Sequence, residues 1–338
     1  MDLAQERHIK HQRVTQYLRG HQLDGVLLSQ RANFSWYTCG LRNYVSVGSE
    51  TGNCHMLVTE HGAIVITSNI ETPRLRLEDF AGADAPANIE IVEFPYYDLA
   101  QRAKVFAELM GGRRIACDSI LPLAPAPLLA GDFARLRWSL TESEIERYRS
   151  LCNDTVAAVE FVARDAEPGT SEHELGGMVA GALRACGCVP WIVLASADER
   201  AEKFRHPLPT GRQVRRFFML SVVAERGGLM ASTSRLVSFG PIDDLLARKH
   251  EAAAMIDAAM ITSTHPGVPY AEIFKQAQAA YARSGFPHEW QLCDQGGSTG
   301  YLPRELLAAP AEQTQVLPEQ AFAWNATISP ARCEDTII

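Results

Sequence analysis

The chain has 338 residues, of which 46% are hydrophobic and 21% are charged, and its net charge is −8. This composition is typical of a globular protein with a full core, and it excludes a mainly disordered chain. The acidic balance provides no bulk positive field for nucleic acid or anionic lipid, so neither is expected as a partner. At about 150 residues per domain, the length predicts two domains.

The sequence predicts a cytoplasmic protein without a membrane span. Its eight cysteines are scattered and include no C-x-x-C pair, which favours a reducing compartment over a disulfide framework. The N-terminal residues lack the apolar stretch of a signal peptide. The strongest apolar run, residues 188–196, is far shorter than the roughly 20 residues of a membrane-spanning helix.

The first part of the chain alternates helix and strand patterns, which predicts a small α/β domain over residues 1–135. Apolar spacing predicts helices over residues 5–20 and 99–111. Short apolar segments bounded by turn residues predict strands over residues 25–29, 52–59, 63–67, 89–94 and 114–118. The Pro-rich stretch 121–129 is the best candidate boundary before a second domain over residues 136–338.

Two capping boxes mark helix starts in the second part of the chain. The box at Thr141–Glu144 begins a helix that runs to about Ala166, and the box at Ser171–Glu174 begins a helix that ends at Gly187. Strands follow over residues 190–195 and 216–223.

An internal repeat appears at an offset of 98 residues. Glu167-Pro-Gly and the acidic residue five positions after its Gly recur as His265-Pro-Gly with Glu272, and Gly187 falls on Gly285. Chance reuse of helix-stop and helix-start residues is the alternative to a duplicated helix-and-sheet half. Two such halves about a pseudo-two-fold axis predict a site at their junction, where ligand pockets are favoured. Under this offset, His206 falls on Arg304.

The segment Gly296–Gly300 matches the G-x-S-x-G pattern of serine hydrolases, but the pattern lacks its context. That nucleophile needs a histidine later in the chain, and all ten histidines precede Ser298. The segment is instead predicted to be a Gly-rich turn between strands. Phosphate-binding glycine loops and the zinc-binding H-E-x-x-H pattern do not occur in the sequence.

Five motifs in order and at matching spacing resemble the creatinase, prolidase and methionine aminopeptidase superfamily, whose catalytic domain has the pita-bread fold. The first resembles N-x-x-W-x-T of the N-terminal domain, and the others resemble His-Pro, G-Y-x-x-D-x-T-R, G-H-G-x-G-x-x-x-H-E and the closing E-P to E-D-T stretch. They are Asn33–Thr38, His206–Pro207, Gly228–Arg235, Gly296–Glu305 and Trp324–Thr336. The resemblance implies an α/β (α+β) protein with a creatinase-like N-terminal α/β domain, followed by a pita-bread domain with an internal pseudo-two-fold repeat.

This chain departs from the superfamily at the metal-binding positions. Metal-dependent members hold two divalent ions with two Asp, one His and two Glu, an oxygen-rich set suited to clamping a nucleophilic water. Only the last Glu, Glu334, remains; Ser221, Ser232, Gly297 and Asn325 stand at the other four positions. One carboxylate cannot neutralise two dications, so no dinuclear metal site and no cofactor are predicted.

Creatinase is the metal-free precedent, and the resemblance implies that His206 is the catalytic general base and acid. Glu334, the second catalytic candidate, would orient His206 or bind a cationic amidine or amine. Arg304, with Glu305 beside it, would clamp a substrate carboxylate. Arg235 and Arg332 are weaker candidates for substrate binding, and Arg235 is also suited to bracing the fold.

Neutral polar groups would line the vacated metal pocket. Ser221, Ser232 and Asn325 favour a polar organic ligand there, and a water-filled pocket is the alternative. Trp324 either caps the pocket or fills the core.

The leading interpretation is metal-independent hydrolysis of a C–N bond, in an amide or amidine of a small carboxylate-bearing substrate or short peptide. A metal-dependent Xaa-Pro dipeptidase or aminopeptidase and a non-catalytic binding or scaffold protein are the alternatives. The resemblance also suggests a homodimer in which the N-terminal domain of one subunit closes the pocket of the other.

Overall fold

The computed structural model describes residues 2–81, 89–122 and 124–338, and the chain divides into two compact units. The first unit comprises Met1–Arg137 and Thr141–Ser143, and the second comprises Trp138–Leu140 and Glu144–Ile338. The Pro-rich stretch 121–129 falls in the first unit, with Leu123 outside the described residues.

The first unit is built on a five-stranded sheet with the order β4-β3-β2-β1-β5. β1 pairs antiparallel with β2 and parallel with β5, while β3 pairs antiparallel with β2 and parallel with β4. Apolar side chains of these strands pack with Phe106 of α4 in one buried cluster. The elements are α1 (Leu3–His21), β1 (Gly25–Gln30), α2 (Arg31–Tyr37), β2 (Thr51–Thr59), β3 (Gly62–Ser68), α3 (Thr72–Arg74), a π-helical turn (Leu75–Asp79), β4 (Ile89–Phe94), α4 (Leu99–Met110), β5 (Ile115–Cys117) and a 3₁₀ turn (Gly131–Arg137).

The second unit contains a three-stranded sheet β6-β7-β8, a four-stranded sheet β10-β9-β11-β14 and the pair β12-β13. Its helices flank these strands. The elements are α5 (Glu142–Asp165), α6 (Glu172–Ala185), β6 (Val189–Ala197), α7 (Glu199–Lys203), β7 (Phe217–Arg226), β8 (Leu229–Ser238), α8 (Asp244–Ser263), α9 (Tyr270–Arg283), a 3₁₀ turn (Glu289–Gln291), β9 (Gly296–Thr299), β10 (Leu306–Leu307), β11 (Ala321–Trp324), β12 (Ala326–Ile328), β13 (Ala331–Cys333) and β14 (Thr336–Ile337).

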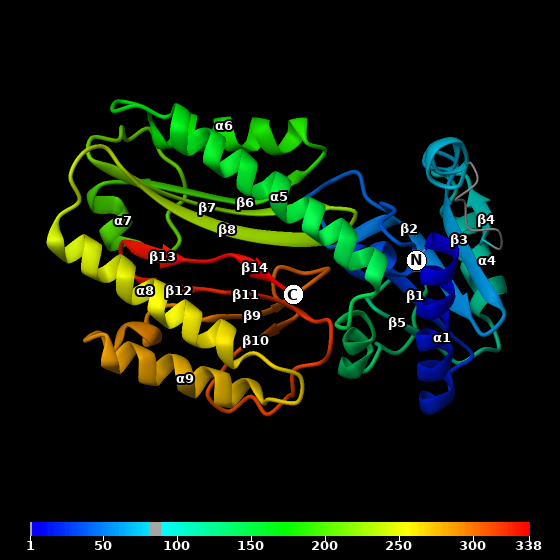
Figure 1. The fold of residues 1–338 in the computed structure, drawn as a ribbon. Helices are drawn as coiled ribbons and strands as arrows, with labels where there is room; N and C mark the ends of the chain where they lie inside the picture. Colours follow the sequence, from blue (N-terminus) through cyan, green and yellow to red (C-terminus); the bar gives the residue numbers. More distant parts are fainter. Residues whose placement is uncertain (1, 82–88, 123) are drawn as a thin grey trace. The chain divides into compact units, whose positions relative to one another are not determined.

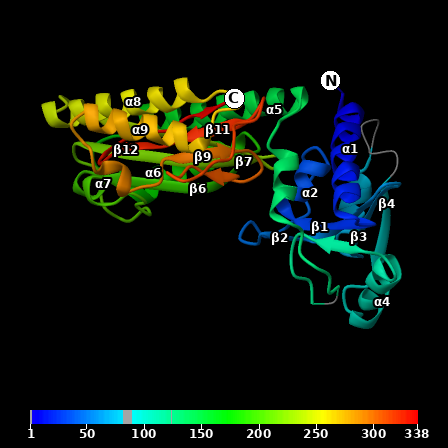
Figure 2. The same cartoon turned by 90° about the horizontal axis from the view of Figure 1, so that it is seen from below.

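Helix pairs cover the sheets of the second unit. Figure 1 shows α5 and α6 along the sheet β6-β7-β8, and Figure 2 shows α8 and α9 beside β9, β11 and β12. The sequence predicts α6 by its capping box, in which the side chain of Ser171 accepts from the Glu174 N–H, and the Glu174 carboxylate accepts from the Ser171 N–H. Its apolar stripe, Leu175, Val179 and Leu183, is completely buried. All helices and strands named in the sequence analysis are present, within two residues at most ends.

The repeat is visible in matching backbone hydrogen bonds. Gly169 N donates to Val214 O at 2.8 Å, and Gly267 N donates to Val316 O at 2.9 Å. In the next rung, Glu172 N donates to Arg212 O and Tyr270 N donates to Thr314 O. Both glycines have positive φ, 101° and 89°, which favours glycine at these two turns. Each helix pair is therefore tied to a following extended segment in the same way.

The prediction of a Gly-rich turn over Gly296–Gly300 is wrong. Gly296–Thr299 forms β9, which pairs antiparallel with both β10 and β11. Turn propensity is overridden here because the backbones of β11 and β10 approach Gly296 and Gly297 too closely for a side chain at either position. A Cβ on Gly296 would lie 2.1 Å from the carbonyl oxygen of Ala323. Glycine is required at this position by close packing of backbones.

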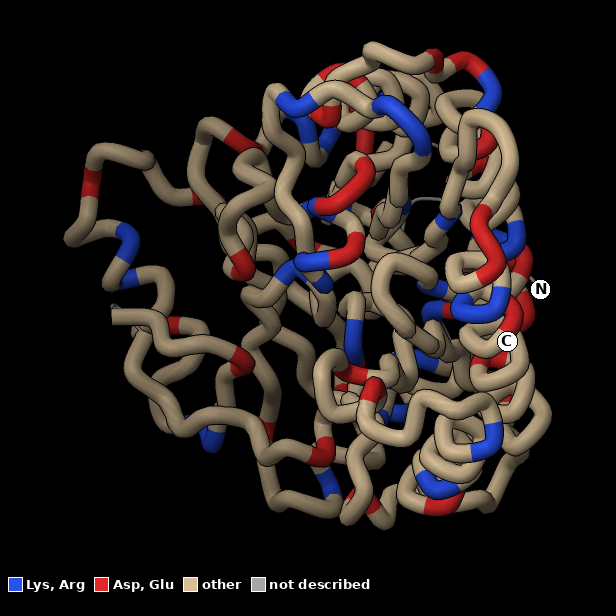
Figure 3. Tube along the Cα trace, turned by 90° about the vertical axis from the view of Figure 1, so that its left-hand side faces the viewer, with Lys and Arg blue, Asp and Glu red and all other residues tan. Residues whose placement is uncertain are grey.

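Charges of both signs are interspersed along the trace, as Figure 3 shows. In the described part of the chain, no helix has both the length and the apolar character needed to cross a bilayer.

Candidate functional site

A buried carboxylate, Glu334, lies among hydroxyl and guanidinium groups in the second unit. The side chain of Glu334 is 5% exposed. One of its oxygens, Oε2, accepts from the hydroxyls of Ser234 at 3.0 Å and Ser221 at 3.4 Å. The other, Oε1, accepts from Nη2 of Arg304 at 3.1 Å. The carboxylate therefore has partners on both oxygens, as a buried charge requires.

The β7–β8 hairpin fixes the serines on one face. Ser221 pairs directly with Ser234, and Val223 pairs with Ser232. Residues opposite each other and residues two apart share a face, so all three serines face the same way. A backbone bond from Ser234 N to Glu334 O, at 2.9 Å, brings the C-terminal segment to this face.

Arg304 links Glu334 to a second carboxylate, Asp294. Nε of Arg304 lies 3.8 Å from Oδ1 of Asp294, and Nη1 donates to the carbonyl oxygen of Pro303 at 3.0 Å. The guanidinium side chain is 25% exposed, so it is partly shielded from water. Arg304 therefore places a fixed positive charge between two carboxylates.

His206 lies with Cys293 and Asp294. A ring nitrogen of His206, the sulfur of Cys293 and a carboxylate oxygen of Asp294 lie within 4.8 Å of one another. His206 is exposed, in the loop between α7 and β7, while the other two side chains are partly buried. In the described residues, His206 forms no hydrogen bond with Glu334, whose partners are Ser221, Ser234 and Arg304. The carboxylate beside its ring in this cluster belongs to Asp294.

Two donors converge on the sulfur of Cys293. Nδ2 of Asn325 lies 3.7 Å from Sγ, and Nη2 of Arg332 lies 3.8 Å from it. Asn325 is held there because its Nδ2 also donates to the carbonyl oxygen of Asp294, at 3.1 Å. Burial raises the pKa of the Cys293 thiol, and the guanidinium of Arg332 opposes that shift.

Arg332 also connects the two groups of side chains. Its Nη1 lies 3.5 Å from the hydroxyl of Ser221, and its Nη2 donates to the carbonyl oxygen of Arg205 at 2.9 Å. The residues from Glu334 to His206 thus form one continuous polar site.

The remaining candidates lie around this site. Ser232 is 2% exposed, and its hydroxyl has no hydrogen-bond partner among the described residues. Arg235 pairs with Asp335 at 3.0 Å, the arrangement expected of a bracing arginine. The carboxylate of Glu305 accepts from the N–H of Tyr301 at 3.0 Å.

Trp324 is a core residue in the structure. It is 1% exposed, stacks on Phe322 with 5.3 Å between ring centroids, and donates its indole N–H to the hydroxyl of Thr264 at 3.0 Å. Of the two roles expected from the sequence, its surroundings match core filling.

The residues at the superfamily's metal positions do not fit two divalent ions. Serine hydroxyls and an amide replace three carboxylates, and Glu334 is already paired with Arg304. A Cβ on Gly297 would lie 2.1 Å from the carbonyl oxygen of Leu306, so this backbone accepts no histidine at the fourth position. The carbonyl oxygen of the Asn325 side chain accepts from Thr327 Oγ1 at 3.1 Å. The donor set and its contacts therefore disagree with a dinuclear site.

A cavity of about 380 Å³ lies between α8 and strands β8 and β13. Glu334, Arg332 and Ser234 line it together with Asp257 of α8 and Asp335. Burial, with smaller contributions from Asp335 and Glu334, raises the pKa of Asp257 to about 7. This cavity gives the site a partly enclosed, polar wall.

The protonation of Asp257 is expected to make stability depend on pH. Its folded pKa of about 7 exceeds the ordinary value of 3.8, so the folded state binds more protons between these values. Asp257 should therefore contribute a fall of about 2 kcal/mol in the free energy of unfolding as the pH rises from 4 to 7, since one pKa unit is worth about 1.4 kcal/mol and nearby solvent reduces the total. Urea unfolding of wild type and Asp257→Asn at both pH values measures this. An equal change of the free energy of unfolding with pH in the two proteins would contradict this role of Asp257.

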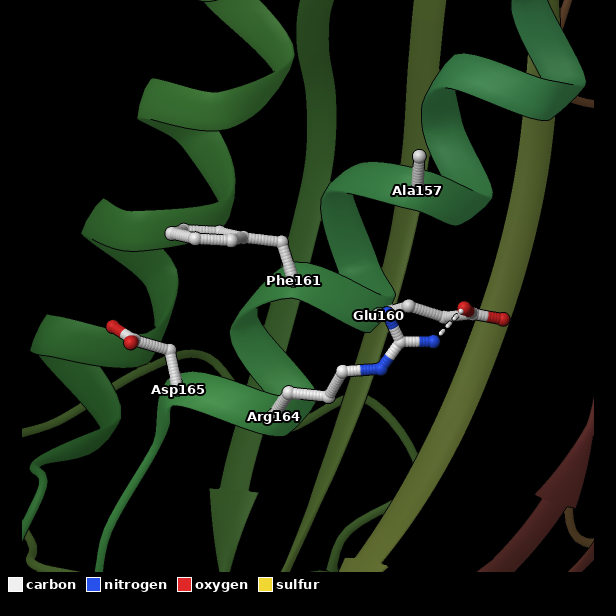
Figure 4. Close-up of a pocket in the computed structure, with 5 residues that line it drawn as sticks. All are labelled: Ala157, Glu160, Phe161, Arg164 and Asp165. Carbon is white, nitrogen blue, oxygen red and sulfur yellow. Dashed lines mark hydrogen bonds and ion pairs between the residues drawn. The ribbon is translucent and has the colours of Figure 1, made fainter.

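A second depression, of about 280 Å³, lies on α5 alone (Figure 4). Its side chains are Ala157, Glu160, Phe161, Arg164 and Asp165, with an ion pair of 2.8 Å between Arg164 and Glu160. It shares no residue with the polar site, and nothing in its lining points to chemistry.

Ser234, Cys293 and Asp294 belong to the site but were not among the residues predicted from the sequence. Cys293 and Asp294 directly precede the segment with the missing histidine, and Ser234 lies two residues after Ser232. This closeness in sequence to predicted site residues is the signal by which they could have been found. His206 lies 87 residues before Cys293 in the sequence (293 − 206), so their approach to within 4.8 Å is visible only in the three-dimensional structure.

Comparison with known proteins agrees with this architecture. The model of metallopeptidase family M24 matches residues 146–305. No curated protein sequence matches the chain.

Solved structures of several proteins share the fold over nearly the whole chain. The prolidase from Pyrococcus horikoshii OT3 has a TM-score of 0.80 at 17% identity, covering 97% of this chain and 94% of that one. The Xaa-Pro dipeptidase from Bacillus anthracis has a TM-score of 0.77 at 16% identity, covering 98% and 94%. The N-terminal domain of the FACT complex subunit SPT16 from Cicer arietinum has a TM-score of 0.71 at 14% identity, covering 100% and 94%. At these identities the likeness shows the fold alone.

Proposed function

Because the chain belongs to the creatinase, prolidase and methionine aminopeptidase superfamily, with its pita-bread fold, we propose that it is a metal-independent hydrolase. Its reaction is hydrolysis of a C–N bond, in an amide or amidine of a small, carboxylate-bearing substrate or short peptide. His206 is the general base and acid. The family match supports hydrolysis, and the side chains of the site support the finer assignment.

One observation carries the proposal: His206 is retained beside Asp294, while Arg304 pairs with Glu334, the remaining superfamily carboxylate. An imidazole ring can both accept and donate a proton, so it suits removal of a proton from a nucleophile and its delivery to a leaving nitrogen. The carboxylate of Asp294 lies close enough to favour the protonated imidazole that forms between these steps.

The fixed charges and the neutral polar groups of the site bind the substrate. Arg304 and Arg332 supply positive charge for a substrate carboxylate. Ser221, Ser232 and Asn325 supply neutral hydrogen-bonding groups, and the unpartnered hydroxyl of buried Ser232 favours a ligand there. Arg235 and Glu305 have internal partners, which supports a positioning role for both.

Metal content tests the metal-independent part of the proposal. Protein purified without chelators, and then incubated with manganese or cobalt, is expected to retain less than one ion per chain, because one paired carboxylate cannot balance two dications. Plasma mass spectrometry measures this. About two tightly held ions per chain, the number that metal-dependent relatives use, would contradict it and favour a metal-dependent Xaa-Pro dipeptidase or aminopeptidase.

A non-catalytic binding or scaffold protein is the second candidate, favoured by the loss of four ligand positions. It is distinguished by ligand binding without turnover. We also propose that the chain is a cytoplasmic homodimer, as the superfamily and the scattered cysteines suggest. A monomer mass by light scattering would contradict the dimer.

A further inference from the structure

We propose that Cys293 is the nucleophile of this hydrolysis, activated by His206, so that the reaction passes through a thioester or its amidine counterpart. The inference rests on the proposed function and names the group that attacks the substrate. Cys293 and His206 lie on segments far apart in the chain, and their reactive atoms lie within 4.8 Å. A nucleophile and its base are commonly more widely spaced without substrate than the roughly 2.6–3.2 Å of their hydrogen bond, so this separation is compatible with such a pair.

The surroundings of the sulfur favour a thiolate. Asn325 and Arg332 direct N–H groups at Sγ from 3.7 and 3.8 Å. Such donors stabilise the anion more than the neutral thiol. Burial nevertheless raises the pKa of Cys293, so a base is needed to remove its proton. His206 is that base, and Asp294 is a positioning residue for the imidazole.

A metal site is the competing interpretation, since Cys, His and Asp side chains also bind zinc. The charges nearby oppose it. The guanidinium of Arg332 lies 3.8 Å from the sulfur, and that of Arg304 lies 3.8 Å from the Asp294 carboxylate. Two positive groups at this distance repel a dication and attract an anionic thiolate.

The steps balance without an additional reactant except water. His206 takes the thiol proton, and the thiolate forms a bond to the carbonyl or amidine carbon. The C–N bond then breaks, and His206 returns the proton to the leaving nitrogen. In the second half, water loses a proton to His206 and attacks the carbon of the thioester or of the thioimidate. The C–S bond breaks and the proton returns to sulfur. The thioester releases an acid, and the thioimidate releases an amide.

Alkylation by iodoacetamide at pH 7, mapped by mass spectrometry on the full chain, tests the pair without a substrate. We expect His206→Gln to slow modification of Cys293 at least about tenfold, in line with the contribution of a positioned base. Cys186, which is exposed and outside the site, is the internal control and should react equally in both proteins. Equal rates at Cys293 in the two proteins would overturn the inference.

A second probe, p-nitrophenyl acetate, reports acyl transfer directly. We expect an acetyl group on Cys293 in wild type and in Cys186→Ala, and its loss at this position in His206→Gln. Absence of the acetyl group from wild-type Cys293 would overturn the inference. Stoichiometric zinc in wild type that is lost in Cys293→Ala would also overturn it, because the cysteine would then be a ligand.

These outcomes separate the inference from the proposed function. Amide turnover that depends on His206 and survives in Cys293→Ala would remove the nucleophile and leave the hydrolase. His206-dependent acetylation of Cys293 without turnover of any amide or amidine would support the reactive pair and remove the hydrolase.

Discussion

Replacing His206 with alanine is expected to lower kcat for amide or amidine hydrolysis by about 100- to 10,000-fold, the usual contribution of a general acid and base. Ligand affinity should stay within a few fold, because the imidazole is exposed and the charged contacts belong to Arg304 and Arg332. Steady-state kinetics and calorimetric titration of the same variant measure both quantities. The split between kcat and affinity distinguishes a catalyst from a binding protein.

His173→Ala is the matched control for this experiment. His173 is an exposed histidine on α6, outside the polar site. Its replacement should leave both quantities unchanged. Turnover by His206→Ala at the wild-type rate would contradict the assignment of His206, whatever the substrate.

Arg304→Met is expected to lower the free energy of unfolding by about 3 kcal/mol, because it leaves the buried carboxylate of Glu334 without its ion-pair partner. Ser221 and Ser234 would still donate hydroxyl hydrogen bonds, which sets the loss at the lower end for a buried pair. Urea unfolding at pH 7 measures the change.

The control is Arg164→Met, which breaks an ion pair of 2.8 Å on the surface of α5. The side chains of Arg164 and Glu160 are 80% and 41% exposed, so we expect the free energy of unfolding to fall by about 0.5 kcal/mol or less. In the double variant Arg304→Met, Glu334→Leu, stability should return toward wild type, since both charges are removed together. Equal losses in the free energy of unfolding for Arg304→Met and Arg164→Met would show that the buried carboxylate of Glu334 does not need Arg304 as its partner.

The sequence predicted most elements because their local signals agree with the fold. The capping box at Ser171 and the buried stripe Leu175, Val179 and Leu183 specify α6 without distant contacts. The prediction of a turn over Gly296–Gly300 was wrong, because the glycines there make room for the backbones of neighbouring strands. This need for glycine arises from residues that are distant in the sequence, so no local sequence pattern reveals it.

For the site, the sequence identified several of the residues but not the side chains that they contact. Ser221, Ser232 and Glu334 follow from motif spacing, and the hairpin places the two serines on one face. The pairing of Arg304 with Glu334, and of Cys293 with His206, depends on how loops meet in space. These partners determine the expected chemistry, so the resemblance alone could not specify it.

The two copies of the repeat differ in length at one place. Their first matched positions are 98 apart, as in Gly169 and Gly267, whereas the extended segments that they bind are 102 apart, as in Val214 and Val316. The offset is 98 at His173 and Ala271 (271 − 173), and it is 102 at Thr210 and Glu312 (312 − 210), whose carbonyl oxygens accept from these two N–H groups. The four extra residues of the second copy therefore lie between Ala271 and Glu312, in the stretch that contains β9 and β10.

The two parts of the site also differ in how they meet solvent. Arg304 is held by the carboxylate of Glu334 at 3.1 Å and the carbonyl oxygen of Pro303 at 3.0 Å. His206 is exposed on the loop between α7 and β7. The site thus combines a positive charge that is fixed by its neighbours with an imidazole that is open to water.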